Sequence, residues 1–311
     1  MDAGNTILQI VSSFIEADLR VAAPILIAAI GILYMEKAGV VNIGAEGTML
    51  IGALAGSIGA YLFQNPWMGA LLAGLVGGLV GVLFAYLVVT IKANQIVAGI
   101  AINILALGGT TTVNRIFFGL NASSANIPSF QKTAIPFLSD IPIFGSVFNQ
   151  FGLAYAAFLL VPFTYYLMKK TTIGLKIRSV GEHPEAADTA GISVPRIRYG
   201  TVIIGSAIIG VAGAYLSVGL LSFFSENMVS GRGYIALAAV IFGKWNPYGI
   251  FIATFLFGFG DALQVRLQTM GSSIPYQFLL MMPYLLTVAA LAGFVGKAVA
   301  PKASGKPYFK G

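Results

Sequence analysis

Long apolar stretches, separated by short polar connections, run through most of the chain. A helix that crosses the hydrocarbon core of a bilayer needs ~20 mostly apolar residues. On this measure nine stretches predict membrane-spanning helices, near residues 21–35, 47–63, 67–91, 94–113, 152–168, 199–222, 233–244, 247–264 and 275–295. The first, second and seventh stretches are short. If one of these short stretches is re-entrant, the number of spans is eight or ten.

The amino-acid composition agrees with a lipid environment. Hydrophobic residues make up 57% of the chain, charged residues only 9%, and the mean hydropathy is +0.86. Soluble domains carry about 25% charged residues, so this chain lacks the charge to cover its surface in water. We therefore expect an all-α fold, a polytopic integral membrane bundle of about 8–10 transmembrane helices, which forms a single transmembrane domain over residues 1–311.

The residue types that carry most enzyme chemistry are scarce. The chain has no cysteine, which excludes disulfides, thiolate catalysis and cysteine-bound metal. Its one histidine, His183, excludes a multi-histidine metal site within this chain. The carboxylates are scattered along the sequence, so we expect no catalytic residue, no metal and no cofactor.

Basic residues predict the orientation of the chain. The net charge is +7, but the basic residues are not interleaved with aromatic residues in a soluble segment, so we expect lipid contact and no nucleic-acid partner. With the N-terminus outside and nine alternating spans, 13 of the 18 Lys and Arg residues lie on the cytoplasmic side and 5 on the outer side. Because positive residues concentrate on the cytoplasmic side, we expect an outer N-terminus and a cytoplasmic C-terminus.

Two long connections lie outside the predicted spans, an extracellular loop over residues 114–151 and a cytoplasmic loop over residues 169–198. In the cytoplasmic loop, Pro184 suits the first position of a helix, where its missing N–H costs nothing. Gly191 suits the left-handed position that follows a last helical turn. These residues predict a helix of about two turns, roughly 184–190. From the residues alone, this helix is either a contact for a soluble partner or a plain connector.

The same loop contains one of five longer sequence motifs. They run from Gly174 to Ile192, from Glu36 to Gly47, from Ser222 to Pro247, from Leu291 to Gly296 and from Gly305 to Tyr308. Together these motifs resemble the ABC permease family that serves branched-chain amino acids, simple sugars and nucleosides. The later motifs are most similar to the nucleoside-uptake, guanosine-type branch of that family, and the resemblance covers nearly the whole chain.

The resemblance implies the ABC importer permease fold and a division of labour. A substrate-binding lipoprotein captures a nucleoside outside, this chain and a second, paralogous permease form the path, and a cytoplasmic ABC ATPase supplies the energy. The chain has no Walker A sequence, which agrees with ATP hydrolysis by a partner. The chain would then be a non-enzymatic, multi-pass subunit in a bacterial cell membrane. The resemblance places coupling to the ATPase at Gly181, Glu182, His183, Pro184, Glu185, Ala186, Ala187, Asp188 and Gly191.

Polar residues in and between the spans are candidates for the translocation path. The stretch 36–47 is polar and interrupted by glycine, a pattern that points to the substrate site in transporters, although an ordinary cytoplasmic turn would also fit. An amide inside a bundle otherwise makes an interhelical hydrogen bond, and an ionisable residue within a span is a functional candidate. The candidates for the path are Asn42, Glu46, Asn94, Gln95, Asn103 and Asp261.

Three alternatives compete with nucleoside import. The same machinery would serve simple sugars or branched-chain amino acids, since related branches share the fold. A secondary transporter driven by an ion gradient needs ionisable groups deep in the bundle, and the predicted spans hold almost none. A membrane enzyme needs a cluster of acid, base or metal-binding residues, which the sequence does not offer.

Overall fold

The computed structural model describes residues 3–119, 127–137, 139, 141, 144–269, 275, 277–279, 281, 285 and 298–310. Within these ranges, seven helices are long and apolar enough to cross a membrane. They are α1 (Ala3–Lys37), α2 (Ala45–Phe63), α3 (Pro66–Ala85), α4 (Gln95–Phe118), α5 (Gly152–Lys170), α8 (Val194–Ala214) and α10 (Pro247–Thr269). The predicted all-α, polytopic membrane bundle is therefore confirmed.

Shorter elements complete the described part of the chain. Helices α3 and α8 each continue as a π-helical turn, and the remaining elements are three short helices, one 3-10 turn and two strands. These elements are η1 (Tyr86–Thr90), η4 (Tyr215–Leu221), α6 (Thr172–Glu182), α7 (Pro184–Thr189), α9 (Arg232–Phe242), η3 (Phe144–Phe148), β1 (Lys132–Ala134) and β2 (Asn149–Phe151). The predicted span 233–244 is α9, which is too short to cross a bilayer, and the predicted span 275–295 lies almost entirely outside the described residues.

Helix α1 begins at Ala3, well before the predicted start near residue 21. Polar residues interrupt the apolar pattern in the first half of α1, but they are paired or packed inside the protein. Glu16 and Arg20 lie one helical turn apart and form an ion pair at 3.0 Å, and Asp18 is buried. A hydropathy pattern places the edge of a span at such positions, because it carries no information on the Glu16–Arg20 ion pair or on the packing around Asp18.

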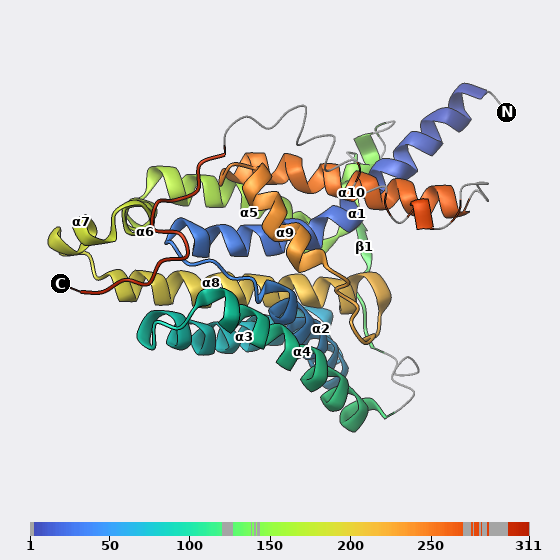
Figure 1. The fold of residues 1–311 in the computed structure, drawn as a ribbon. Coiled ribbons are helices and arrows are strands. Elements are labelled where there is room, and N and C mark those ends of the chain that lie inside the picture. The colour runs from blue at the N-terminus through green and yellow to red at the C-terminus, as the bar shows by residue number, and fades with distance from the viewer. Residues whose placement is uncertain are drawn as a thin grey trace.

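The centre of the bundle is formed by helices that approach through glycine. Helix α8 lies between α1 and α3 and also packs against α2 (Figure 1). A Cβ atom at Gly213 of α8 would overlap the Met49 carbonyl oxygen of α2, and one at Gly210 would overlap the Ala73 carbonyl oxygen of α3. Lipid tails give helices no hydrophobic drive to associate, so close backbone approach supplies the van der Waals packing instead.

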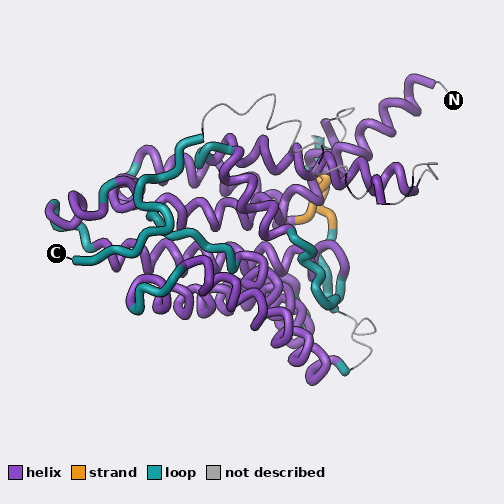
Figure 2. The backbone as a smooth tube through the Cα atoms, viewed as in Figure 1, coloured by secondary structure: helices purple, strands orange, loops and turns teal. Residues whose placement is uncertain are grey.

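The extracellular loop predicted over residues 114–151 holds more order than its composition suggested. Helix α4 extends to Phe118, and β1 pairs with β2 in antiparallel register, with Lys132 opposite Phe151 (Figure 2). Residues 120–126, 138, 140 and 142–143 of this loop lie outside the described part. Sequence patterns favoured a loop because strands of three residues are too short to show an alternating pattern.

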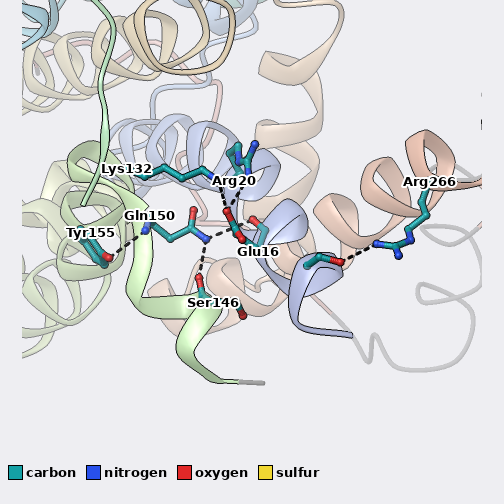
Figure 3. A network of polar contacts seen from close by, with 8 residues as sticks. Glu16, Arg20, Lys132, Ser146, Gln150, Tyr155 and Arg266 are labelled. Carbon is teal, nitrogen blue, oxygen red and sulfur yellow. Dashed lines mark hydrogen bonds and ion pairs between the residues drawn. The ribbon is translucent and has the colours of Figure 1, made fainter. Parts of the chain in front are cut away.

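A polar network fastens this loop to α1 (Figure 3). Lys132 of β1 pairs with Glu16 of α1. Gln150 of β2 donates to the backbone oxygen of Glu16 at 3.4 Å and to that of Ser146 at 3.0 Å. Tyr155 accepts from the Gln150 N–H at 3.1 Å. The network lies at the end of the bundle near the N-terminus, opposite the end that carries α7 and the C-terminus (Figure 1).

Candidate functional site

The chain leaves helical geometry between α1 and α2, over residues 38–44. Gly39 has a φ of +84°, a left-handed conformation that favours glycine. The N–H of Val41 donates to the side-chain oxygen of Gln95 on α4 at 2.8 Å. The glycine-interrupted stretch predicted from the sequence is thus a helix break, and its backbone is held by a buried side chain of another helix.

Asn103 joins this break to two helices. Its side-chain oxygen accepts from the N–H of Gly47, in the first turn of α2, at 2.7 Å. Its amide nitrogen donates to the Ile43 carbonyl at 3.1 Å and to the Tyr234 hydroxyl of α9 at 2.8 Å. The first N–H groups of a helix have no partner within the helix, so Asn103 supplies one for α2.

Glu46 supplies hydrogen-bond acceptors for the N–H groups at the start of α9. Its two carboxylate oxygens accept from the N–H groups of Gly231 and Gly233, each at 2.7 Å. Negative charge at a helix N-terminus is favourable because of the helix dipole. A Cβ atom at Gly233 would lie 2.6 Å from the Cα of Glu46, so glycine is required for this approach. We refer to Glu46, Gln95, Asn103 and Tyr234 as the polar bridge.

Two other candidates from the sequence lie beside the polar bridge. Asp261 of α10 faces Arg232 at the start of α9, with 4.0 Å between the charged groups. Asn42 is fully buried in the helix break, where its amide nitrogen lies 3.5 Å from the sulfur of Met35. Its side-chain oxygen has no hydrogen-bond partner among the described residues.

Asn94 differs from the other candidates. It is exposed, and its side-chain oxygen accepts from the N–H groups of Ile96 at 2.9 Å and Val97 at 3.2 Å. This geometry makes Asn94 the N-cap of α4. The sequence could have indicated this role, because an asparagine directly before an apolar helix is a common start signal.

Tyr234 was not singled out from the sequence. The residue is 47% exposed, and its hydroxyl accepts a hydrogen bond from the Asn103 amide. One signal was available, since it follows Gly231, Arg232 and Gly233 in a polar stretch between apolar ones. Its proximity to Asn103, however, depends on the packing of α9 against α2 and on the position of α4, which hydropathy does not specify.

The helix predicted near residues 184–190 is confirmed as α7 (Pro184–Thr189). Pro184 occupies its first turn, and Gly191 follows its end with a φ of +80°. The N–H of Ile192 donates to the Ala187 carbonyl at 3.0 Å, the bond that accompanies such a glycine. The sequence did not predict α6, which precedes α7 and is capped by the hydroxyl of Thr171.

Helix α7 turns one face inward and one outward. Ala187 packs with Val180 of α6 and Val194 of α8 in a small apolar cluster separate from the main core. His183 and Glu185 are exposed, as are Glu182 and Ala186. Of the predicted coupling residues, these four are therefore at the surface, whereas Gly181 and Ala187 are buried beneath them.

Comparison with known proteins identifies the family. Residues 14–291 match the model of the branched-chain amino acid transport system permease component. The chain belongs to this family. It is 41% identical to the guanosine ABC transporter permease protein NupQ of Bacillus subtilis, over 98% of this chain and 99% of the relative. No solved structure matches it significantly.

Two further relatives show the range of the family. The chain is 36% identical to the nucleoside ABC transporter permease protein NupC of Lactococcus lactis subsp. cremoris, over 100% of this chain and 99% of the relative. It is 34% identical to the putative glucose ABC transporter permease protein TsgC13 of Haloferax volcanii, over 86% of this chain and 81% of the relative. With its apolar helices, the chain is a multi-pass permease subunit of an ABC transporter and not an enzyme.

Proposed function

We propose that this chain imports nucleosides as one of two permease subunits of an ATP-driven transporter. The polar bridge is the observation that carries the proposal. Polar groups at membrane depth are tolerated only where protein or water surrounds them. Here they gather where α2, α4 and α9 meet, and Tyr234 is about half exposed. This face is the lining of the path.

The path is completed by a second subunit. Helix α4 is the least buried of the seven long helices, with 28% of its most apolar 18-residue segment buried, compared with 33% for α3 and α5 and 89% for α1. Asp261 and Arg232 retain side-chain exposures of 21% and 25%, which lipid would penalise. A paralogous permease placed against α4 and α9 covers these groups and encloses the path between the two chains.

The chemistry of the polar bridge suits a nucleoside. A nucleoside offers a flat base and several hydroxyl and amide-like groups. An exposed tyrosine ring stacks on a base, an interaction of about 1–3 kcal/mol per base in nucleic-acid complexes, while the amide of Asn103 hydrogen-bonds to polar edges. The names of NupQ and NupC, a guanosine and a nucleoside permease, support this cargo.

Helix α7 couples ATP hydrolysis by the partner to transport by this chain. In the proposed orientation the N-terminus lies outside, and α7 faces the cytoplasm with the exposed Glu185 available to a separate ATPase. ATP binding brings the ATPases together and displaces α7, which rocks the helices and opens the path toward an extracellular binding lipoprotein. ATP hydrolysis restores the inward-facing state.

Uptake of radiolabelled guanosine tests the cargo. Cells that lack this chain lose uptake, and the intact gene restores it. We expect unlabelled nucleosides to compete, whereas glucose and leucine do not. The similarity to TsgC13 makes simple sugars the second candidate, and competition by glucose alone would replace the nucleoside proposal with that one.

Cysteine labelling tests the orientation, because the native chain has no cysteine. Ala186→Cys places a thiol on the exposed side of α7, and Phe137→Cys places one at a position that is 89% exposed near the opposite end. An impermeant maleimide added to intact cells should label only Phe137→Cys. Labelling of Ala186→Cys from outside would invert the orientation and remove the basis for ATPase contact.

A further inference from the structure

Residues 298–310, which we call the C-terminal tail, cross the end of the bundle beside α6, α7 and α8 (Figure 1). The N–H of Ala303 donates to the carbonyl of Gly181, in the last turn of α6, at 2.9 Å. Two residues later, the N–H of Gly305 donates to the Gly39 carbonyl at 3.1 Å. The tail therefore bonds to the α6–α7 corner and to the helix break within three residues.

Arg198 of α8 fixes the next part of the tail. Its side chain is only 1% exposed, and one terminal nitrogen donates to the Lys306 carbonyl at 3.0 Å. Burying a guanidinium is unfavourable unless it is paired or hydrogen-bonded. Its bond to a backbone oxygen of the tail links this buried cation to the position of residues 305–307.

Side chains of the tail contact α7 directly. The ammonium group of Lys302 lies 3.3 Å from the His183 ring nitrogen. Tyr308 packs against the apolar cluster under α7 and lies beside Asp188. Desolvation, and then the neighbouring Asp188 and Glu185 carboxylates, raise the pKa of the Tyr308 phenol.

A cleft of about 420 Å³ separates α7 from the tail. Glu182 at the end of α6 and Glu185 of α7 line one side, while Lys302 and Lys306 line the tail side. The two walls therefore carry opposite charges. A protein surface that fits this cleft must itself offer both signs.

We propose that the tail is the second half of the docking surface for the ATPase and that it transmits the displacement of α7 to the helix break. This inference rests on the proposed function. Helix α7 packs on α6 and α8 through Ala187, and the tail adds a hydrogen-bonded connection between the α6–α7 corner and the helix break. The tail connects α7 to Gly39, and the helix break connects Gly39 to Ile43, which is bound by Asn103 of the polar bridge.

The test uses the complete transporter, reconstituted in liposomes with its ATPase and loaded binding protein. Three tail variants are compared, Tyr308→Ala, Tyr308→Phe and a chain that ends at Pro301. We measure nucleoside transported per ATP hydrolysed, and the amount of ATPase that copurifies. Lys310→Ala serves as the control, because Lys310 is exposed at the far end of the tail.

The expected result is a roughly tenfold fall in transport per ATP for Tyr308→Ala, the scale of losing one contact to a charged group, and a larger fall for the shortened chain. Tyr308→Phe should lie between Tyr308→Ala and the wild type, because it keeps the apolar packing. Lys310→Ala should match the wild type. A fall in transport with unchanged ATP hydrolysis separates lost transmission from general damage.

Wild-type transport per ATP in both Tyr308 variants would overturn the inference, whatever the shortened chain does. Glu185→Lys separates this failure from failure of the proposed function. If Glu185→Lys uncouples the transporter and the Tyr308 variants do not, α7 is the ATPase contact and the tail has no part in it. If neither Glu185→Lys nor the Tyr308 variants change transport per ATP, the proposal that α7 couples the ATPase to transport is refuted as well.

Discussion

Helix α2 meets its neighbours in two different ways. Toward α8 it packs backbone against backbone, with Gly52 against Gly210 and Gly213 against Met49. Toward α4 and α9 it is held by side-chain hydrogen bonds from Asn103 and Glu46. The first contact has no space for an added methyl group, while the second leaves polar groups and part of a tyrosine ring accessible. The α2–α8 contact suits a unit that moves as one body, and the polar bridge suits a boundary where cargo passes.

The largest effect is expected in the glycine-packed contact. Gly213→Ala forces a methyl group onto the Met49 carbonyl, so the helices must separate. Overpacking typically destabilises by about 1–3 kcal/mol and occasionally by more, and Gly213 belongs to the larger cases because the atoms that would have to shift are backbone atoms of α2. We expect little folded protein in size-exclusion profiles after detergent extraction. Gly108→Ala is the matched control, since no described atom lies within 4 Å of its added methyl group. Equal profiles for the two variants would refute the packing argument.

The next effect concerns Glu46. Glu46→Ala removes both hydrogen bonds to the start of α9, and hydrogen bonds to charged groups contribute about 1.5–3 kcal/mol each. The thermal unfolding temperature should fall, and uptake should drop by at least about tenfold. Glu226→Ala removes an exposed ion pair with Arg115, which is worth about 0–1 kcal/mol, and should change neither measurement. If the two variants behave alike, Glu46 does not organise the polar bridge.

A smaller effect separates Asn103 from Asn94. Asn103→Leu removes three hydrogen bonds of a kind worth roughly 0.6–2 kcal/mol each in membranes. It should lower both thermal stability and nucleoside uptake. Asn94→Ala removes only a helix cap, at about 1 kcal/mol, and should lower stability while transport per folded molecule stays the same. A transport defect in Asn94→Ala would instead place that residue in the path.

The smallest effect is expected for the Tyr234 hydroxyl. Tyr234→Phe loses one hydrogen bond, about 0.5–1.5 kcal/mol, and keeps the ring. The KM for guanosine uptake should rise a few fold, by about the factor that this energy implies. Tyr234→Leu keeps an apolar side chain but removes the ring, and should raise the KM further. A tyrosine that faces lipid would give equal KM values in the two variants.

Local signals in the sequence predicted most of the helices. Long apolar stretches indicated the seven long helices, and Pro184 with Gly191 indicated α7 and its limits. They failed where order depends on distant residues. The start of α1 includes Glu16, whose partners Lys132 and Gln150 come from another part of the chain. The strands β1 and β2 are too short to be seen without each other.

The sequence by itself determined that the chain resides in lipid, where its apolar helices lie, and which polar residues interrupt them. These properties depend on hydropathy and on residues a few positions apart. Only the tertiary structure decided that Glu46 caps a helix beginning near residue 231, that Asn103 joins three segments, and that the C-terminal tail meets Gly39. Such contacts depend on how helices pack, and packing is set by the shapes of surfaces brought together from distant parts of the chain.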